Sequence, residues 1–347
     1  MAANPNLEKE CLDWYTKNRE LYRACAGSVH RLLTTLLEQA GIPFHSIQYR
    51  VKDQKSFLDK CMKPRYKSPL EEITDVCGLR IITYTNKDVD DICKIIEKHF
   101  SIDPEKSINK ADLLHANEVG YLSVHYIAKL NQPRVKLDEY KPYSNICFEI
   151  QVRTLLQHAW AEIEHDRSYK FSGELPQDIK RRFFLVAGTL ELMDREFNLL
   201  AHEIDQYAAT VHSEAKSGNL DFAIDSTSLF EYLKVKLKDY PDVECTFCDG
   251  DKEIVQELND CGFTTLASLD KIMDETIIKA VLDASNSAGG TNYIGFLRGM
   301  MMVTVPKLYF EKAWQHHWGG IKIEEFNYLA SINSELKNFD RLIDLIP

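Results

Sequence analysis

The clearest fold signal in this 347-residue chain is the stretch NICFEIQVR (145–153), which TLLQHAWAEIEHDRSYK (154–170) follows directly. From the second to the eighth residue of the first stretch, every second residue is apolar, and this alternation predicts a half-buried strand. Side chains alternate between the two faces of a strand, so Glu149, Gln151 and Arg153 share the other face. That row is either a solvated sheet face or a line of functional side chains. The second stretch has helical spacing and predicts a helix directly after the strand.

Further strands and helices are predicted on either side of this stretch. Strands are expected at His45–Lys52, Leu79–Thr85 and Tyr121–Leu130, and helices at 6–40, 54–62, 88–100 and 179–207. The order of these elements predicts an α+β domain, in which a mixed β-sheet is covered by helices. After residue 205 the helical patterns are short and broken by Gly, Pro and Asp, which predicts a smaller helical module. We therefore expect two domains, 1–205 and 206–347.

The composition is that of a globular protein, with 44% hydrophobic and 27% charged residues. No run of about 18 apolar residues occurs, so neither a membrane-spanning helix nor a membrane partner is expected. The start, MAANPNLEKE, lacks the basic and apolar parts of a signal peptide, and we expect a cytoplasmic protein. The nine cysteines are an odd number and are expected to stay reduced.

Charge is distributed unevenly along the chain. The net charge is −11, and residues 201–347 account for all of it with 24 acidic and 13 basic side chains. The balanced first part contains a basic island made of Arg50, Lys52, Lys55, Lys60, Lys63, Arg65 and Lys67. A local cluster of cations in an acidic protein predicts a site for a small polyanion rather than general binding to DNA. The alternative is a solvated charged surface.

The basic island has the spacing of a strand followed by a helix. Arg50 and Lys52 are two residues apart and share a strand face, while Ser56 and Lys60 are four apart and share a helix face. Such a strand–turn–helix unit can aim three cations and a hydroxyl at one point, which is what binding a triphosphate requires. It is not a P-loop, because the glycines of that motif are missing.

Two other motifs carry groups suited to nucleotide chemistry. Asp75 begins the motif DVCGLR, just before a predicted buried strand, where a carboxylate can hold Mg²⁺ or simply pair with an arginine and close a turn. In the motif GYLSVH, Tyr121, Ser123 and His125 share a strand face. An aromatic ring, a hydroxyl and an imidazole in a row suit stacking on a base and contact with its sugar or phosphate. An ordinary half-exposed strand would have the same pattern.

Together, these motifs resemble the RelA/SpoT-type alarmone synthetase domain. The shared pattern is Arg50-x-Lys52-x3-Ser56-x3-Lys60, then DVCGLR, GYLSVH and EIQVRT, in that order between about residues 47 and 170. The resemblance implies a nucleotidyltransferase-like sheet and the transfer of pyrophosphate from ATP to the 3′-hydroxyl of GDP or GTP, with release of AMP. It also implies Mg²⁺ as cofactor. The family's separate hydrolase domain, with its His-Asp metal pair, has no counterpart in this sequence.

The same resemblance assigns roles on the ATP side of the site. The residues that would bind ATP are Arg50, Lys52, Ser56, Lys60 and Arg80. The two arginines would flank the adenine, and the two lysines and the serine would hold the phosphates.

The resemblance also assigns the catalytic and acceptor groups. Asp75 and Glu149 would bind Mg²⁺, and Glu149 would accept the proton of the attacking hydroxyl. His125 would lie beside the reacting phosphates. The residues assigned to the acceptor are Tyr121, which would stack on its base, and Ser123, Gln151 and Arg153.

One departure from the family pattern concerns the acceptor. Typical members carry a Lys and an Asn just before the Gly-Tyr pair, where this chain has Asn117-Glu118-Val119. A carboxylate beside an acceptor diphosphate has the wrong sign, although Lys106 and Lys110 can compensate from the same loop. Two alternatives stay open: toxin-like pyrophosphorylation of the tRNA 3′ end, as in toxic small members of the family, and an inactive nucleotide-binding regulator.

The acidic C-terminal module has no catalytic motif. One expectation is that it lies against the basic substrate face and restrains the enzyme until a protein regulator displaces it. The other is that it serves stability or the formation of an oligomer.

Overall fold

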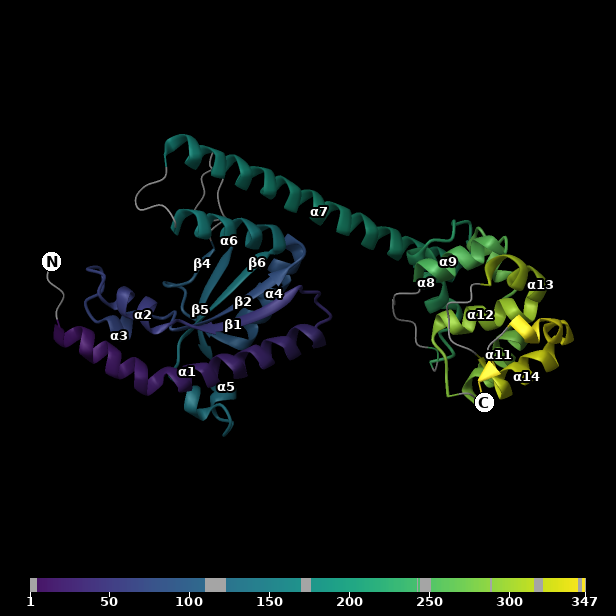
Figure 1. Cartoon of the computed structure of the whole chain (residues 1–347), viewed down its shortest axis with the longest axis horizontal. Coiled ribbons are helices and arrows are strands. Elements are labelled where there is room, and N and C mark those ends of the chain that lie inside the picture. Colours follow the sequence, from purple (N-terminus) through teal and green to yellow (C-terminus); the bar gives the residue numbers. More distant parts are fainter. Residues whose placement is uncertain are drawn as a thin grey trace. The chain divides into compact units, whose positions relative to one another are not determined.

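The computed structural model describes residues 5–109, 123–169, 176–241, 243, 251–287, 289–314, 321–342 and 345–346. The chain divides into two compact units, Met1–Ala201 (unit 1) and His202–Pro347 (unit 2). One helix, α7 (Gln177–Ser217), belongs to both units (Figure 1). None of the described helices combines the length and the apolar character that a membrane span requires.

Unit 1 is built on a six-stranded mixed sheet with the strand order β1-β2-β6-β5-β3, to which β4 adds by pairing with β5. The strands are β1 (Ser46–Val51), β2 (Cys77–Thr83), β3 (Phe100–Ile102), β4 (Ile108–Asn109), β5 (Val124–Leu130) and β6 (Phe148–Thr154). Only the central pair, β2 and β6, runs parallel; the other pairings are antiparallel. The two central strands are therefore flanked on both sides and carry the most buried residues of the sheet.

Helices cover the sheet of unit 1 (Figure 1). Besides α7 they are α1 (Pro5–Gln39), α2 (Gln54–Cys61), α3 (Pro69–Glu72), α4 (Asn86–His99), α5 (Gln132–Val135), α6 (Leu155–Tyr169) and the 3-10 turn η2 (Lys141–Tyr143). The apolar sheet face, with Ile81 and Ile150 fully buried, packs against α1 and α4. Helix α6 lies on the other side of the sheet from α1 (Figure 1). The polar sheet face therefore looks toward the α6 side.

Unit 2 is a bundle of short helices with a core of its own. Its elements are α8 (Ser226–Lys236), α9 (Asp251–Asp260), α10 (Leu266–Asp270), α11 (Glu275–Ser287), α12 (Tyr293–Thr304), α13 (Pro306–Leu308), the π-helix η3 (Tyr309–Ala313), β7 (Ile321–Lys322), α14 (Ile323–Ile332), η4 (Ser334–Leu342) and β8 (Leu345–Ile346). Apolar residues of α12 such as Phe296, Met300 and Met301 are fully buried at its centre. The three consecutive methionines 300–302 are thus part of the core of unit 2.

The four predicted strands are confirmed, with β5 described from residue 124 onward. The prediction that the long helix ends at residue 207 is wrong, because α7 continues to Ser217. It ends where Gly218 adopts a φ of 89°, a left-handed conformation typical of the residue after a helix.

Candidate active site

Polar side chains from neighbouring strands share the face of the sheet that looks toward α6. The strand register gives two rows on this face, which read Gln48–Arg80–Gln151–His125 and Arg50–Gly78–Glu149. The residues between them on β2 and β6 are apolar and belong to the core that includes α1 and α4. Because one sheet face is buried, the alternation along the strands fixes which side chains can meet here.

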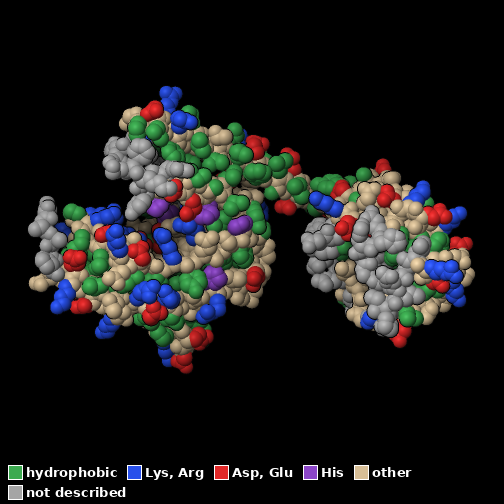
Figure 2. Space-filling model, in the orientation of Figure 1, with side chains coloured by type: hydrophobic (Ala, Val, Ile, Leu, Met, Phe, Trp, Pro, Cys, Tyr) green, Lys and Arg blue, Asp and Glu red, His purple; other side chains and the backbone are tan. Residues whose placement is uncertain are grey.

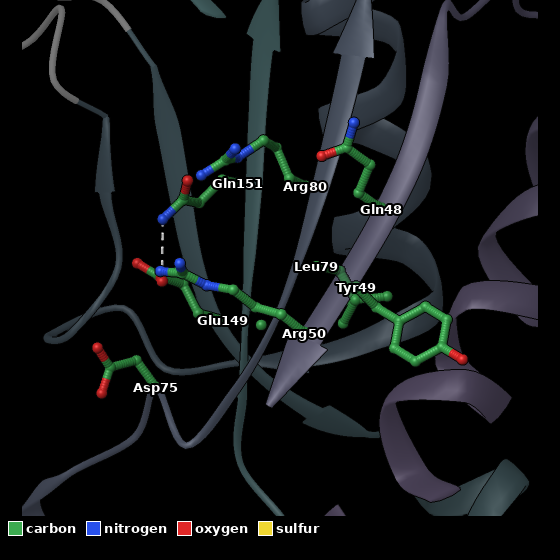
Figure 3. Close-up of a pocket in the computed structure, with 9 residues that line it drawn as sticks. Gln48, Tyr49, Arg50, Asp75, Leu79, Arg80, Glu149 and Gln151 are labelled. Carbon is green, nitrogen blue, oxygen red and sulfur yellow. Dashed lines mark hydrogen bonds between the residues drawn. The ribbon is translucent and has the colours of Figure 1, made fainter. Parts of the chain in front are cut away.

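These rows enclose a cavity of about 110 Å³ at the centre of the sheet face (Figure 3). Its lining includes Arg50, Asp75, Arg80, Glu149 and Gln151. Lys, Arg and His side chains also gather on the surface over this sheet (Figure 2). The site therefore joins cations to carboxylates, the combination that a metal–polyphosphate complex requires.

Asp75 is held by two lysines of the basic island. Its Oδ2 lies 2.7 Å from Lys60 Nζ and 3.1 Å from Lys52 Nζ. Burial alone would raise the pKa of Asp75, but the hydrogen bond and charge of Lys60 and the charge of Lys52 outweigh it and hold this pKa below its ordinary value. The carboxylate is thus ionised at neutral pH. Its second oxygen, Oδ1, is buried and has no hydrogen-bond partner.

Glu149 is held by its two neighbours on the same face. His125 Nδ1 lies 2.9 Å from Oε1 of Glu149 and donates to it. Gln151 Nε2 donates to Oε2 at 3.0 Å, a bond that Figure 3 marks. Burial raises the pKa of Glu149, but His125 and Gln151 lower it more, and the net shift is downward. The charge of Asp75 opposes them. The two carboxylates are therefore close enough to influence one another.

The donor set at this point fits a hard divalent cation. Two ionised carboxylates face one cavity, and one buried oxygen of Asp75 lacks a partner. Among the described residues, no cluster of three or more His, Cys, Asp or Glu side chains could hold a metal ion. A cation held by Asp75 and Glu149 alone needs further oxygen ligands, and the phosphates of a substrate are the usual source for Mg²⁺.

Comparison with known proteins shows the family of this chain. Residues 49–174 match the family described as "Region found in RelA / SpoT proteins". Over 181 residues the chain is 31% identical to GTP pyrophosphokinase YjbM of Bacillus subtilis (strain 168), covering 51% of this chain and 81% of YjbM. The chain belongs to the RelA/SpoT family.

A second curated protein and a solved structure are also similar to the chain. GTP pyrophosphokinase YwaC of Bacillus subtilis (strain 168) is 25% identical over 168 residues, covering 47% of this chain and 76% of YwaC. The crystal structure of small alarmone synthetase 1 from Bacillus subtilis superposes with a TM-score of 0.48 at 24% identity, covering 56% of this chain and 99% of that one. The region of the family match lies entirely within unit 1.

Four of the five residues predicted for ATP lie at the site, because Arg50 and Arg80 line the cavity and Lys52 and Lys60 contact Asp75, whereas the fifth, Ser56, is exposed and does not line it. Asp53 caps α2 by accepting a hydrogen bond from the backbone N–H of Ser56 at 2.9 Å. This bond fixes the turn between β1 and α2, the helix that carries Lys60. Arg50 lines the cavity (Figure 3). Arg80 lines it too, but its Nη1 also donates to Oε1 of Glu162 on α6 at 2.7 Å. Glu162 of α6 therefore holds the guanidinium of Arg80 in one orientation before any ligand binds.

The residues predicted for the acceptor are only partly brought together. Gln151 lies in the cavity beside Glu149, whereas Arg153 is 3% exposed and lies 3.5 Å from Glu162. Ser123 is also 3% exposed, and its hydroxyl, which has no partner, lines a second cavity of about 480 Å³ beside α4 and α7. Tyr121 lies outside the described residues, as do Lys110 and the stretch 117–119.

Sequence reasoning missed two residues of the site. Gln48 lines the cavity two positions before Arg50, and the same alternation that pairs Arg50 with Lys52 could have identified it. Glu162 orients Arg80 and approaches Arg153 from α6. It had no comparable signal, because the contact joins residues 82 positions apart in the sequence.

Proposed function

We propose that this protein transfers pyrophosphate from ATP to the 3′-hydroxyl of GDP or GTP. The products would be AMP and a guanosine nucleotide that carries a 3′-pyrophosphate. The relatives named GTP pyrophosphokinase support this activity for the chain. The observation that carries it is the pair of facing carboxylates, Asp75 and Glu149, set among the cations of one cavity.

The cations provide a place for the phosphates of ATP. Lys52 and Lys60 both contact one oxygen of Asp75, and a bound triphosphate would draw their charge toward itself. Arg50 and Arg80 border the same cavity, where their planar guanidinium groups can stack on the adenine. Mg²⁺ bound by Asp75 and Glu149 would neutralise charge on the transferred phosphates.

Glu149 would remove a proton from the acceptor. In the proposed step the 3′-oxygen bonds to the β-phosphorus of ATP, and the bond from that phosphorus to the α,β-bridging oxygen breaks. AMP leaves with the bond's electron pair, and the hydroxyl proton passes to Glu149. His125 and Gln151 hold the carboxylate in one orientation, so no reorganisation is needed when the hydroxyl arrives.

The direct test incubates the protein with ATP labelled at the γ-phosphate and with GDP, GTP or deacylated tRNA, and measures which acceptor becomes labelled. The expected result is label on GDP or GTP together with an equal amount of AMP. Label on tRNA alone, or on none of the three with a folded protein, would contradict the proposal. Glu149→Gln provides the inactive control, and Glu38→Gln on the exposed end of α1 is its charge-matched partner.

A further inference from the structure

A second cavity of unit 1 lies apart from the candidate active site, and we call it the α4–α7 cavity. Its volume of about 480 Å³ falls in the range of roughly 300–1,000 Å³ that small-molecule sites occupy. Its walls come from α4, β4, the start of β5, the first turn of α6 and the amino-terminal half of α7. None of the described residues that line it also lines the active-site cavity. The two cavities are therefore distinct.

Ser123 gives the α4–α7 cavity a buried polar group that the protein does not satisfy. The residue lines the cavity and is only 3% exposed, and its hydroxyl has no hydrogen-bond partner among the described residues. Buried hydroxyls are normally hydrogen-bonded, because an unpaired one gives up the bonds that water would make with it. A ligand in the cavity would supply the missing partner.

Gly188 opens the wall that α7 contributes to the cavity. It is the only glycine among the 41 residues of α7 and stands in the interior of the helix, where glycine is less favourable than alanine. Because Gly188 lines the cavity, its missing side chain leaves space there. Glycine in such a place is typical of a backbone that a ligand approaches closely.

The buried and half-buried part of the lining is uncharged throughout. It consists of Asn86, Val89, Ser123, Val124, Gln157 and Gly188. Nε2 of Gln157 donates to Oδ1 of Asn86 at 3.3 Å, so the two amides hold one another in place. A charge without a partner is costly to bury, so the part of a ligand that enters must be uncharged as well. Apolar walls with amides and a hydroxyl suit a flat heterocycle that has donors and acceptors along its edge.

The charged residues of the lining are all exposed and are mainly acidic. They are Asp90, Glu191 and Arg195. Carboxylates that accept hydrogen bonds from ribose hydroxyls are a common means of binding the sugar of a nucleoside. The same carboxylates repel a phosphate group, because they outnumber the single guanidinium.

We propose that the α4–α7 cavity binds an uncharged nucleoside, with its base inside and its ribose at the exposed end. The edge of the base would give Ser123 its missing hydrogen bond, and Val89 and Val124 would pack against the ring. The ribose hydroxyls would donate to Asp90 or Glu191. A 5′-phosphate would add negative charge beside these carboxylates, so the corresponding nucleotide should bind more weakly. The proposal is independent of the reaction that unit 1 catalyses.

Saturation-transfer NMR with the full chain tests the proposal, and adenosine and guanosine serve as probes. A non-hydrolysable ATP analogue and GDP are added first in excess, so that they occupy the active site and a nucleoside signal reports a second site. At least one of the two nucleosides should bind. Its 5′-monophosphate should bind at least about fivefold more weakly, the effect of one charge repulsion at about 4 Å in water.

Variants of the cavity wall separate this site from any other. Gly188→Leu adds a large side chain to the cavity and improves the helix propensity of α7, so nucleoside affinity should fall by about tenfold or more in a folded protein. Thr189→Leu adds the same side chain at the next, exposed position and should leave the affinity unchanged. Ser123→Ala should weaken binding severalfold, while the thermal stability of the free chain is kept or increased because no hydroxyl is left unpaired.

Three results would overturn the proposal. The first is that neither nucleoside binds to the wild-type chain. The second is that Gly188→Leu, shown to be folded by circular dichroism and an unfolding curve, binds the nucleoside as tightly as Thr189→Leu does. The third is a monophosphate that binds more tightly than its nucleoside, because the ligand would then not be an uncharged one.

Discussion

Each of the two units contains a carboxylate held by basic side chains, and the two carboxylates differ in how completely their oxygens are hydrogen-bonded. In unit 2, Glu257 is 1% exposed, and both of its carboxylate oxygens accept from Arg298, at distances from 2.6 to 3.2 Å. In unit 1, one oxygen of Asp75 receives two lysines while the other has no partner. We call Glu257 with Arg298 the closed pair, because both carboxylate oxygens are hydrogen-bonded. We call Asp75 with its two lysines the open pair, because one carboxylate oxygen has no partner.

This difference separates a structural ion pair from a binding site. A buried charge must be compensated, and a fork-shaped guanidinium compensates a carboxylate completely. The excess of cations around Asp75 and its unused oxygen instead leave charge and coordination available at a cavity. Electrostatics thus indicate a ligand site in unit 1 and a core contact in unit 2.

The largest effect should come from the carboxylate that faces the acceptor. Glu149→Gln keeps the shape of the side chain but removes the base and a ligand for the cation, so turnover should fall by about 10³-fold or more. Calorimetric titration with ATP should show that nucleotide binding is largely retained. Near-normal turnover in this variant would show that Glu149 is not catalytic.

Opening the closed pair should be costly for stability. Arg298→Met leaves Glu257 buried without its partner, and unit 2 should lose about 3–5 kcal/mol of stability, measured by urea unfolding. The double variant Glu257→Gln/Arg298→Met should lose less than the single variant, because no unpaired charge remains. If the single variant is as stable as the wild type, the pair is not compensated in the way described.

Removing the group that orients Glu149 should have a smaller effect on catalysis. His125→Ala should lower kcat by roughly tenfold to a hundredfold while the KM for ATP changes little. His125→Gln should recover part of the loss, because an amide can also donate to Oε1 of Glu149. A variant in which KM rises and kcat is kept would instead assign His125 to substrate binding.

The open pair should also give a small pH-dependent stability difference. The pKa of Asp75 is lower in the folded chain than its ordinary value, so its contribution is present above the unfolded pKa of about 3.9 and is lost as the pH falls through the folded value. Asp75→Asn should therefore be less stable than the wild type at neutral pH, and the gap should close in acid. Asp239→Asn removes an exposed carboxylate and serves as control. A gap that widens in acid would contradict the assigned pairing.

The sheet and its functional face could be predicted because both depend on a period of two. Alternation around Glu149 and around Arg50 places polar side chains on one face whatever the detailed packing. The pairing of Lys52 and Lys60 with Asp75 could not be predicted, because it depends on how the turn after β1 and the α2 helix meet β2 in space. The same holds for Arg80 and Glu162.

The extent of α7 was misjudged for a local reason. Its residues from 208 onward are ordinary helix formers, and no glycine or proline interrupts them before Gly218. The predicted end at residue 207 therefore coincides with no residue that breaks a helix.

The most direct test of the central claim incubates the full chain with ATP, Mg²⁺ and GDP. Phosphorus NMR then measures both products, the modified guanosine nucleotide and AMP. If unit 1 transfers pyrophosphate, the β- and γ-phosphates of ATP will appear together on the 3′-oxygen of the guanosine nucleotide. AMP will form in equal amount, and Glu149→Gln will form neither product. Formation of ADP with a single transferred phosphate, or release of free phosphate with no product on the acceptor, would contradict the account.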